Sequence, residues 1–492
     1  MPNVSRRSFL WGASTIPFAL WFEKYASAQT ELTRFNVTSA QGQVRLAQYR
    51  SAVGQMMAAP ESSPTGWLFQ WYTHNVRGDR TKAAELTRIY PSSTPQKALA
   101  TEMWNTCQAH HGGDVEDYFL PWHRMYVFFL ERIVRKISND PTFTLPYWNY
   151  SNSAVPSGPR MPTAFINPAA TTNSLFRSNR NTIANNGQPI DQNSPGALNL
   201  NALSQVCYSQ QGAIQGFNLA LDSGLHGTVH VLVGNGQGMG SVPFAANDPI
   251  FWMHHCNIDR LWASWNRAGR LNPTTSVWLD KQFIFADECG ARVVGTVRDF
   301  RDFARLKYTY DSFAPVPATL VGCPPVLLSA AATQKHADVL SGPVRLGSAP
   351  VTVTLEPTPG IGAAAADIRP RVRNLKTGHR LFLVMRNLQT DLQPGVLYNV
   401  YLELPASASA QATKTRKVGA IHFFDAEAGH TDHEDMAGMS SNKFFSFDIT
   451  NLARTLAKTG QLSAKPQVTI VPAGHPESSA QPVVGEISLV EQ

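Results

Sequence analysis

The chain has 492 residues, 43% of them hydrophobic, so it can bury large cores, and its length suggests two or three domains. The formal net charge is +7, but Lys and Arg are spread among acidic residues without a basic run, which argues against nucleic-acid binding. Five cysteines are too few and too scattered for a disulfide scaffold; their odd number leaves at least one outside any disulfide, and one bridge is allowed without an assignable pair.

The N-terminal residues have the parts of an export signal in the expected order. The sequence Ser-Arg-Arg-Ser-Phe-Leu at residues 5–10 is typical of a twin-arginine signal, and the apolar segment 11–22 follows it. Residues 26–28 (Ala-Ser-Ala) offer a cleavage site, so residues 1–28 are predicted to be a signal peptide that is removed. The apolar segment is too short to span a membrane, and no stable membrane anchor is expected. We expect a periplasmic or secreted bacterial protein.

A long buried helix is predicted from Pro121 to Ile137. Proline suits the first turn of a helix, and the apolar residues that follow recur at helical spacing. His123 is therefore expected at the N-terminal end of a core helix.

Histidine is scarce ahead of this helix, which limits the candidates for a metal site. Before the adjacent pair His110 and His111 the chain contains a single histidine, His74. If a metal ion near the helix needs three imidazoles, elimination leaves one set of candidates: His74, His110 or His111, and His123.

A second group of histidines lies in two segments further along the chain. His226 and His230 are four residues apart, so on a helix both imidazoles project from one face and can bind one ion. The block 248–262 carries His254 and His255 at the start of an apolar helix. An isolated pair at this spacing often arises by chance, but the two segments together predict a three-imidazole site. Such ligands suit copper, zinc or iron, and the scarcity of carboxylates argues against di-iron or di-zinc hydrolases.

The two histidine groups together resemble the paired signatures of the tyrosinase, catechol oxidase and haemocyanin group, the type 3 dicopper proteins. The resemblance covers most of the chain, and the block DPIFWMHHCNIDRLW is its most specific part. It implies two copper ions, the first bound by His74, His110 and His123 and the second by His226, His230 and His255. By the same pattern, His254 is a neighbour in the wall of the site.

The resemblance also implies an activity. The expected enzyme is a copper-dependent oxidoreductase that uses dioxygen to hydroxylate monophenols and to oxidise o-diphenols to o-quinones. Its expected partners are a phenolic small molecule and dioxygen, with a copper-delivery protein as a further candidate. Two alternatives stay open: a catechol or o-aminophenol oxidase without monophenolase activity, and a haemocyanin-like oxygen-binding protein.

Three residues bear on the choice between these activities. Asp222 stands one turn before His226, where many relatives carry a Glu that orients water near the coppers and helps to deprotonate monophenols. Asp222 is therefore the candidate catalytic residue, with a plain helix carboxylate as the alternative. Gly227 stands where strong monophenolases often have Asn, and Val242 stands where plant enzymes often place a bulky aromatic. The small Val242 predicts an open entrance.

Two further residues near the predicted ligands have expected roles outside metal binding. Asp259, one turn after His255, is expected to support helix packing and to pair with arginine. Cys107 lies near His110, and a cysteine near this ligand forms a Cys–His thioether in plant and fungal relatives. The spacing differs here, and a buried unreactive thiol is the alternative. The remaining histidines are expected to be surface or packing residues: His336, His379, His422, His430, His433 and His475.

Residues 29–312 are predicted to form a mainly α-helical catalytic domain, a helical bundle that holds the dicopper centre. A Pro/Asn/Ser/Gly-rich loop at residues 151–195 interrupts its helical segments. Near its end, Tyr308-Thr-Tyr310 resembles the Tyr-x-Tyr motif that closes the catalytic domain in this family. A Pro-rich linker is predicted at residues 313–340.

The sequence pattern changes in residues 341–492 to short alternating runs bounded by turn residues. Examples are residues 351–355, 397–402 and 467–471, and several such runs predict a C-terminal all-β, sandwich-like domain. Residues 443–450 resemble a motif in the C-terminal domain of plant polyphenol oxidases, where that domain covers the copper entrance and keeps the enzyme latent. A shield is therefore one hypothesis for this domain, and a stabilising or assembly role is the alternative.

Overall fold

The structure is a computed structural model that describes eight stretches of the chain: residues 16–17, 31–108, 117–151, 159–318, 323, 339–357, 367–427 and 444–492. The predicted cleavage site, the pair His110 and His111, and most of the predicted linker lie outside the described residues. Among the described residues, no helix is both long enough and apolar enough to cross a lipid bilayer.

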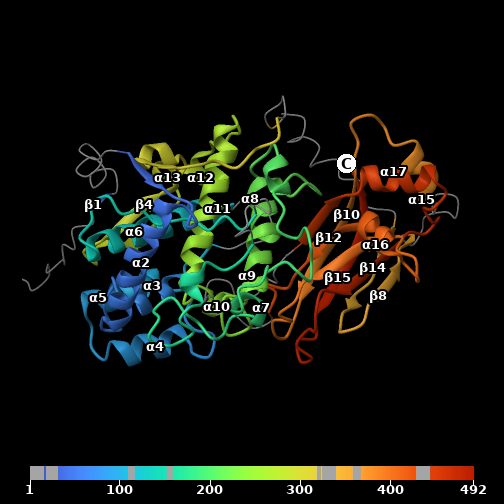
Figure 1. The fold of residues 1–492 in the computed structure, drawn as a ribbon. Coiled ribbons are helices and arrows are strands. Elements are labelled where there is room, and N and C mark those ends of the chain that lie inside the picture. The colour runs from blue at the N-terminus through green and yellow to red at the C-terminus, as the bar shows by residue number, and fades with distance from the viewer. Residues whose placement is uncertain are drawn as a thin grey trace, which may run out of the picture.

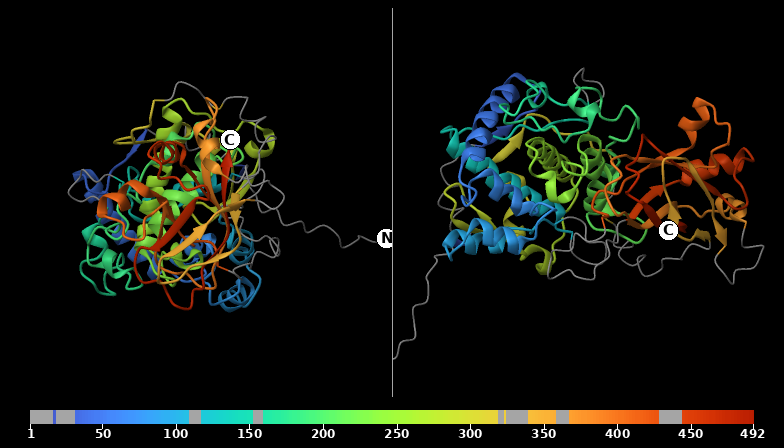
Figure 2. Two further views of the ribbon diagram at one scale, coloured as in Figure 1. Left: turned by 90° about the vertical axis from the view of Figure 1, so that its right-hand side faces the viewer. Right: turned by 90° about the horizontal axis from the view of Figure 1, so that it is seen from below.

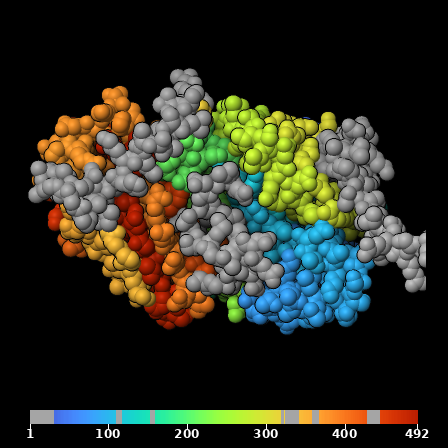
Figure 3. Space-filling model, turned by 180° about the vertical axis from the view of Figure 1, so that it is seen from behind, coloured from blue at the N-terminus to red at the C-terminus, as the bar shows by residue number. Residues whose placement is uncertain are grey.

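The described chain forms two parts that lie side by side, a helical part (residues 31–318) and a β-rich part (residues 339–492) (Figures 1 and 2). This arrangement confirms the predicted order of a mainly α domain followed by a β domain. Each part has its own buried apolar cluster, and a third, small cluster joins them. In the space-filling view the C-terminal residues, in orange and red, form one end of the molecule (Figure 3).

Helices α6 (Phe119–Ile137) and α11 (Ile250–Arg267) pack against each other at the centre of the helical part. Nearly every residue of α11 is buried, including the polar residues His254, His255, Asn257 and Asp259. The other helices of this part surround the pair: α2 (Ala40–Ala58), α3 (Trp67–His74), α4 (Lys82–Ile89), α5 (Pro95–Met103), η1 (Thr163–Phe165), α7 (Thr182–Asn185), η2 (Asn201–Ser204), α8 (Gly216–Ala220), η3 (Leu221–His226), α9 (Gly227–Val233), α10 (Val242–Ala245), α12 (Ser276–Leu279), α13 (Val297–Phe300) and η4 (Phe303–Leu306).

Short strands close the helical part. The backbone of β1 (Ile16–Pro17) pairs in parallel with β4 (Arg292–Thr296), which pairs antiparallel with β3 (Gln282–Ala286). Strand β2 (Leu32–Arg34) pairs in parallel with β5 (Tyr308–Tyr310), so the beginning and the end of the described helical part meet in one ladder. The Tyr-x-Tyr motif is thus the strand that closes this part.

The β-rich part consists of two antiparallel sheets around one apolar cluster. The larger sheet has the order β13-β10-β15-β6-β9, with β7 paired to β15, and the smaller has the order β12-β11-β14-β8. Three helices that the alternating sequence pattern did not predict accompany the sheets: α15, α16 and α17. The bounds of all these elements are β6 (Val339–Ser341), β7 (Val344–Arg345), β8 (Val351–Thr354), β9 (Glu356–Pro357), α15 (Ile368–Arg373), β10 (Leu381–Gln389), β11 (Tyr398–Leu402), α16 (Ala410–Arg416), β12 (Lys417–Ile421), β13 (Phe444–Asp448), α17 (Thr450–Lys458), β14 (Gln467–Pro472) and β15 (Val483–Glu491).

A buried carboxylate holds α6 and α11 together. Asp259 on α11 accepts hydrogen bonds from Arg124 on α6 (2.5 Å) and from Arg34 on β2 (3.0 Å). Its Oδ2 also accepts the hydroxyls of Tyr308 (2.6 Å) and Tyr310 (2.5 Å) on β5. Burial alone would raise the pKa of Asp259, but the two arginines keep it below its usual range. The predicted role of Asp259 in helix packing and arginine pairing is confirmed.

Hydrogen bonds and one disulfide connect the two parts. Cys207, near η2, is bonded to Cys323 in the predicted linker. Three side chains add polar contacts across the boundary: Gln492 accepts from the backbone of Ala213, Gln215 donates to the carbonyl of Phe444, and Ser194 donates to Asn399. The chain that leads into η3 is therefore held against the β-rich part.

Replacing Asp259 by Asn is expected to destabilise the helical part strongly, because it leaves the buried guanidinium of Arg124 without its carboxylate and removes one of the two carboxylates that Arg34 contacts. Loss of one partner in a buried ionic network costs about 3–5 kcal/mol of unfolding free energy. Urea unfolding followed by tryptophan fluorescence reports on this part alone, since all 11 tryptophans lie at or before Trp278. The matched control is Asp280→Asn, which breaks the exposed pair with Arg298 and should cost less than about 1 kcal/mol. Equal effects of the two substitutions would contradict this role of Asp259.

Candidate metal centre

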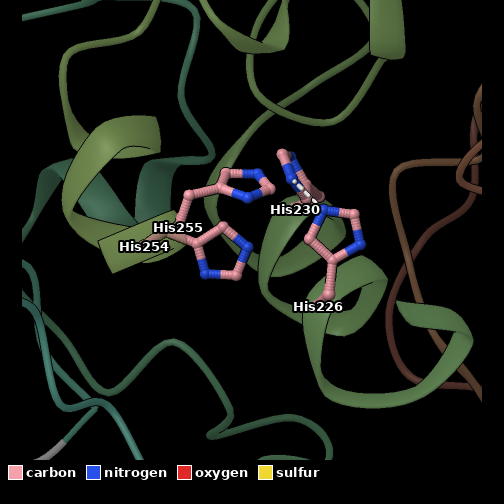
Figure 4. Close-up of side chains that lie close together, drawn as sticks. All are labelled: His226, His230, His254 and His255. Carbon is pink, nitrogen blue, oxygen red and sulfur yellow. Dashed lines mark hydrogen bonds between the residues drawn. The ribbon is translucent and has the colours of Figure 1, made fainter. Parts of the chain in front are cut away.

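Five helical elements bring histidines into two buried clusters. His74 is the last residue of α3, His123 lies in the first turns of α6, and His226 ends η3, one turn before His230 on α9. The doublet lies on α11. In each cluster the candidate ligand atoms lie within 4.8 Å of one another, and the members are His74, Cys107 and His123 in the first and His226, His230, His254 and His255 in the second. Figure 4 shows the four rings of the second cluster converging from α9, η3 and α11.

The two clusters adjoin each other. The ring of His255 stacks on that of His123 with centroids 4.3 Å apart, and the rings of His123 and His226 are 6.2 Å apart. Aromatic side chains pack around the contact: Phe119 lies 4.6 Å from the His226 ring, and Phe251 lies 4.1 Å from the His255 ring. Two metal ions held by these clusters would therefore be neighbours.

The hydrogen bonds on Nδ1 determine which nitrogen of each imidazole carries a lone pair. His123 donates from Nδ1 to the carbonyl of Phe119 (2.8 Å), and His230 donates to that of Met239 (2.7 Å). Nδ1 of His226 faces Asp222, 3.3 Å from its carbonyl and 2.9 Å from its carboxylate Oδ1. These oxygens accept only, so each Nδ1 carries the proton and each Nε2 a lone pair.

These lone pairs fit a metal ion. Nε2 of His226 and Nε2 of His230 lie 3.0 Å from each other, and two lone pairs at that distance repel unless a cation lies between them (Figure 4). Both ring nitrogens of His255 and Nδ1 of His74 are buried and have no hydrogen-bond partner among the described residues. Buried polar atoms are normally paired, so this concentration of unpaired nitrogens is the mark of a ligand set. Neutral nitrogen donors of this kind suit copper.

Burial keeps the imidazoles neutral and therefore able to bind metal. It lowers the pKa of His74 to about 3, with the neighbouring His226 acting in the same direction. It also lowers the pKa values of His123, His230 and His255 well below the usual range. No proton has to leave these rings before an ion binds at neutral pH.

Cys107 lies in the first cluster, but its surroundings favour the protonated thiol over the thiolate that binds metal. Its Sγ is 3.6 Å from Nε2 of His123, and burial raises the pKa of the thiol well above its usual range. The predicted third ligand, His110, and its alternative His111 lie outside the described residues, as does the partner of the predicted thioether. The structure brings His74 and His123 together as predicted.

The second cluster contains one histidine more than the predicted set. His254 lies beside His226 and His230, with ring centroids 5.3 Å and 4.9 Å away. Its Nδ1 is bonded to the hydroxyl of Tyr150 (2.8 Å), whereas His255 has no such partner among the described residues. Tyr150 was not among the predicted site residues, since a tyrosine in an aromatic segment carries no signal of its own.

The candidate catalytic residue Asp222 is fully buried beside a predicted ligand. The segment Leu221–His226 is a π-helical turn, a widened geometry often found at functional sites, and it places the carboxylate against Nδ1 of His226. In this position Asp222 can orient the ring and raise its basicity.

Two side chains of the β-rich part reach the second cluster. Phe424, which follows β12, stacks on the ring of His230 with centroids 4.3 Å apart. His422 is fully buried and donates from Nε2 to the carbonyl of Ser223 (2.9 Å). A Cβ at Gly227 would lie only 2.1 Å from its ring, so this glycine makes room for His422. His422 was predicted to be a surface or packing residue, and packing is the outcome.

Val242, predicted to leave the entrance open, packs against residues of both parts. Its partners form the small cluster that joins them, which contains Leu397 and Phe424 from the β-rich part. The small side chain is present as predicted, but the C-terminal part covers it. Sequence reasoning did not find Phe424, because nothing in the local sequence marks a contact with a helix so far away in the chain.

Comparison with known proteins agrees with this geometry. The family model described as the common central domain of tyrosinase matches residues 64–196 and 167–268, and the polyphenol oxidase middle domain matches residues 272–319. A domain of unknown function matches residues 337–492. The chain is 31% identical to tyrosinase HcTyr1 of Hahella sp. (strain CCB-MM4) over 477 residues, which cover 90% of this chain and 96% of that protein.

More distant relatives share the fold. The chain is 27% identical to the chloroplastic polyphenol oxidase of Malus domestica over 359 residues, covering 62% of this chain and 56% of the relative. Among solved structures, latent aurone synthase matches with a TM-score of 0.60 at 20% identity, over 94% of this chain and 89% of that one. Latent apple tyrosinase matches with a TM-score of 0.58 at 21% identity, over 94% and 98%.

The metal-free chain is expected to lose stability as the pH falls below about 6.5, the pKa of an unperturbed imidazole. Five buried imidazoles have lowered pKa values, namely those of His74, His123, His230, His254 and His255. Below that pH the unfolded chain binds protons that the folded chain does not, and each such histidine costs up to about 1.4 kcal/mol per pH unit.

The measurement is urea unfolding of the chelator-treated chain at pH 7.5, 6.5 and 5.5. The variant His230→Gln removes one of the five groups. Its unfolding free energy should therefore change less steeply with pH, by up to about 1.4 kcal/mol per pH unit. A stability that does not change between pH 6.5 and 5.5 would show that these imidazoles are not kept neutral by the fold.

Proposed function

Because this chain belongs to the tyrosinase family, whose members are type 3 copper phenol oxidases, we propose that it hydroxylates monophenols and oxidises o-diphenols to o-quinones with dioxygen. The observation that carries the proposal is the pair of adjoining buried histidine clusters, in one of which the Nε2 atoms of His226 and His230 face each other. The relationship to a tyrosinase over nearly the full length of both chains supports the same activity.

We propose a ligand set for each copper ion, based on which ring nitrogens have lone pairs and on where the rings lie. The second copper is assigned to His226, His230 and His255, because the first two present lone pairs to each other and the third has two unpaired nitrogens. The first copper is assigned to His74 and His123, with His110 as the third ligand by family pattern.

The residues of the chain prepare the site for the reaction. When bound, the copper pair supplies the redox chemistry with dioxygen that converts phenols to o-quinones. The carbonyls of Phe119 and Met239 fix the ring orientations, and the buried aromatic surroundings exclude water. Asp222 is proposed to hold the ring of His226 and to accept a proton from an incoming monophenol.

A catechol oxidase without monophenolase activity is the second candidate, and one observation favours it. The carboxylate of Asp222 is only 2.9 Å from Nδ1 of His226, so orienting that ring engages the group that would deprotonate a monophenol. Gly227, beside that ligand, carries no side chain of its own that could assist. The two candidates differ in a single measurable property, the oxidation of monophenols.

Oxygen uptake by the copper-loaded mature chain, given tyrosine and a catechol separately, tests the proposal. Uptake with both substrates is expected, and uptake with the catechol alone would establish the second candidate. Asp222→Asn should reduce uptake with tyrosine about 10²-fold or more while affecting the catechol less, since proton transfer by a positioned group contributes at least that much. His230→Gln is the inactive control. A copper-loaded chain that is silent with both substrates would overturn the proposal.

We also propose the domain limits and location given by the sequence. Residues 1–28 are a twin-arginine signal that directs the folded protein to the periplasm or beyond. Residues 29–312 form the dicopper domain, residues 313–340 the linker and residues 341–492 the C-terminal domain. Matches to separate family models at residues 272–319 and 337–492 support a boundary between them. A copper-delivery partner stays a proposal on family grounds.

The C-terminal domain is proposed to shield the copper site. Phe424 covers the face of His230, and Leu397 covers Val242 at the position where the entrance is expected. His422 seats in the space beside Gly227 and is bonded to the helix that carries His226. A phenol ring would have to displace Phe424 to reach the same imidazole. Latent forms are among the solved structures that share this fold, which supports the proposal.

The shield predicts that Gly227→Ala activates the uncut protein. The added methyl group would overlap the buried ring of His422, so the C-terminal domain must shift and catechol oxidation by the uncut chain should rise several-fold. Gly224→Ala is the matched control, because it lies in the adjacent helical turn with nothing within 4 Å of the added Cβ. Phe424→Ala should have the same activating effect as Gly227→Ala.

The activity is measured before and after protease treatment, and the ratio reports the degree of shielding. If cut and uncut wild-type protein oxidise catechol equally, the domain is no shield and a stabilising role stands. Cleavage before Cys323 should be followed by a disulfide reductant, because the bond to Cys207 keeps the C-terminal domain attached.

A further inference from the structure

His254 is the histidine for which the proposed ligand set has no role. It is fully buried, and its ring lies beside those of His226 and His255, with centroids 5.3 Å and 4.9 Å away (Figure 4). Its Nε2 is buried and has no hydrogen-bond partner among the described residues. A buried nitrogen without a partner is unfavourable, so its presence beside the metal centre requires an explanation.

Tyr150 determines which nitrogen of His254 carries the proton. Burial raises the pKa of the Tyr150 hydroxyl well above its usual range, so the hydroxyl keeps its proton. Among the described residues, the acceptor that the structure gives this hydroxyl is Nδ1 of His254, 2.8 Å away, and the hydroxyl therefore donates to that nitrogen. An imidazole that accepts a hydrogen bond at Nδ1 is neutral and has one N–H. That N–H is on Nε2.

This tautomer is the reverse of that in the neighbouring ligands. His226 and His230 donate from Nδ1 to oxygen atoms and present lone pairs from Nε2. His254 accepts at Nδ1 and presents an N–H from Nε2. The second cluster thus contains a hydrogen-bond donor among lone pairs, and a donor cannot bind a metal ion through that atom.

We propose that His254 is a substrate-binding residue whose Nε2–H donates a hydrogen bond to an anionic oxygen or nitrogen atom held at the second metal site, and that Tyr150 is its positioning residue. The ligands of this class are phenolates and small anions such as azide. The inference rests on the proposed function and deepens it, since it names the protein group that meets the substrate oxygen. Tyr150 is itself placed by the backbone bond from Trp148 to the carbonyl of Met253 on α11 (3.2 Å).

Azide titration of the copper-loaded full chain tests the proposal without turnover. The copper content is measured first, and azide affinity is then followed by the absorption band of azide on oxidised copper. His254→Phe should retain two copper ions per chain, while its dissociation constant for azide rises about tenfold, which corresponds to about 1.4 kcal/mol. His254→Gln should recover most of the affinity because its amide supplies an N–H. Tyr150→Phe should weaken azide binding less than His254→Phe, because the ring stays but its tautomer is no longer fixed.

Two controls make the outcome specific. Tyr49→Phe removes another buried tyrosine hydroxyl, which donates to the carbonyl of Pro249 at the start of α11, and it should leave azide affinity unchanged. His255→Gln should lose one copper ion. If His254→Phe loses a copper ion, His254 is a ligand and the inference is overturned. If it keeps both ions and its azide affinity does not change, the hydrogen bond is absent and the inference is again overturned. A wild-type chain that binds no copper would overturn the proposed function itself.

Discussion

The ionic contact between Arg124 and Asp259 is the constraint on which the metal centre depends. Each of these residues belongs to one of the two central helices, and Arg124 directly follows the proposed ligand His123, whereas Asp259 lies one turn after His255. The contact therefore fixes the relative position of two imidazoles that are proposed to bind different metal ions. Both charges are buried, so breaking the contact would leave the guanidinium of Arg124 without its carboxylate. Strands β2 and β5 add Arg34 and two tyrosine hydroxyls to the same carboxylate, which places the ends of the helical part in one network.

Burial has two opposite effects in this fold. At Asp259 it is offset by guanidinium groups, and the carboxylate stays charged. At the histidines no charge compensates it, and the rings stay neutral. The same apolar packing thus produces a charged structural contact and, a few residues away, a set of uncharged ligands. A cation that enters such a site is bound by lone pairs alone and retains its full charge toward an anionic substrate.

Much of the fold and of the site could be predicted from local sequence. The apolar stripe after Pro121 predicted α6, and the spacing of His226 and His230 correctly predicted that the two rings meet. Alternating runs predicted the strands of the C-terminal part, but not α15, α16 or α17, which are short and polar on one side. The bond between Cys207 and Cys323 and the contact of Phe424 with His230 could not be predicted, because they join distant segments and no residue type marks them. The tautomer of His254 likewise depends on Tyr150, a partner that only the folded chain supplies.

Gly227 shows how two requirements can meet at one position. Next to the ligand His226, a side chain at this position would project beside the metal centre, where it could act on the substrate. In this chain the space belongs to His422 instead, and a Cβ at residue 227 would overlap its ring. A larger residue at position 227 would therefore require the C-terminal domain to pack differently against the helical part. Substrate chemistry and the docking of that domain are coupled here by simple exclusion of volume, so a comparison of residue 227 between relatives has meaning only together with the residue that faces it from the C-terminal domain.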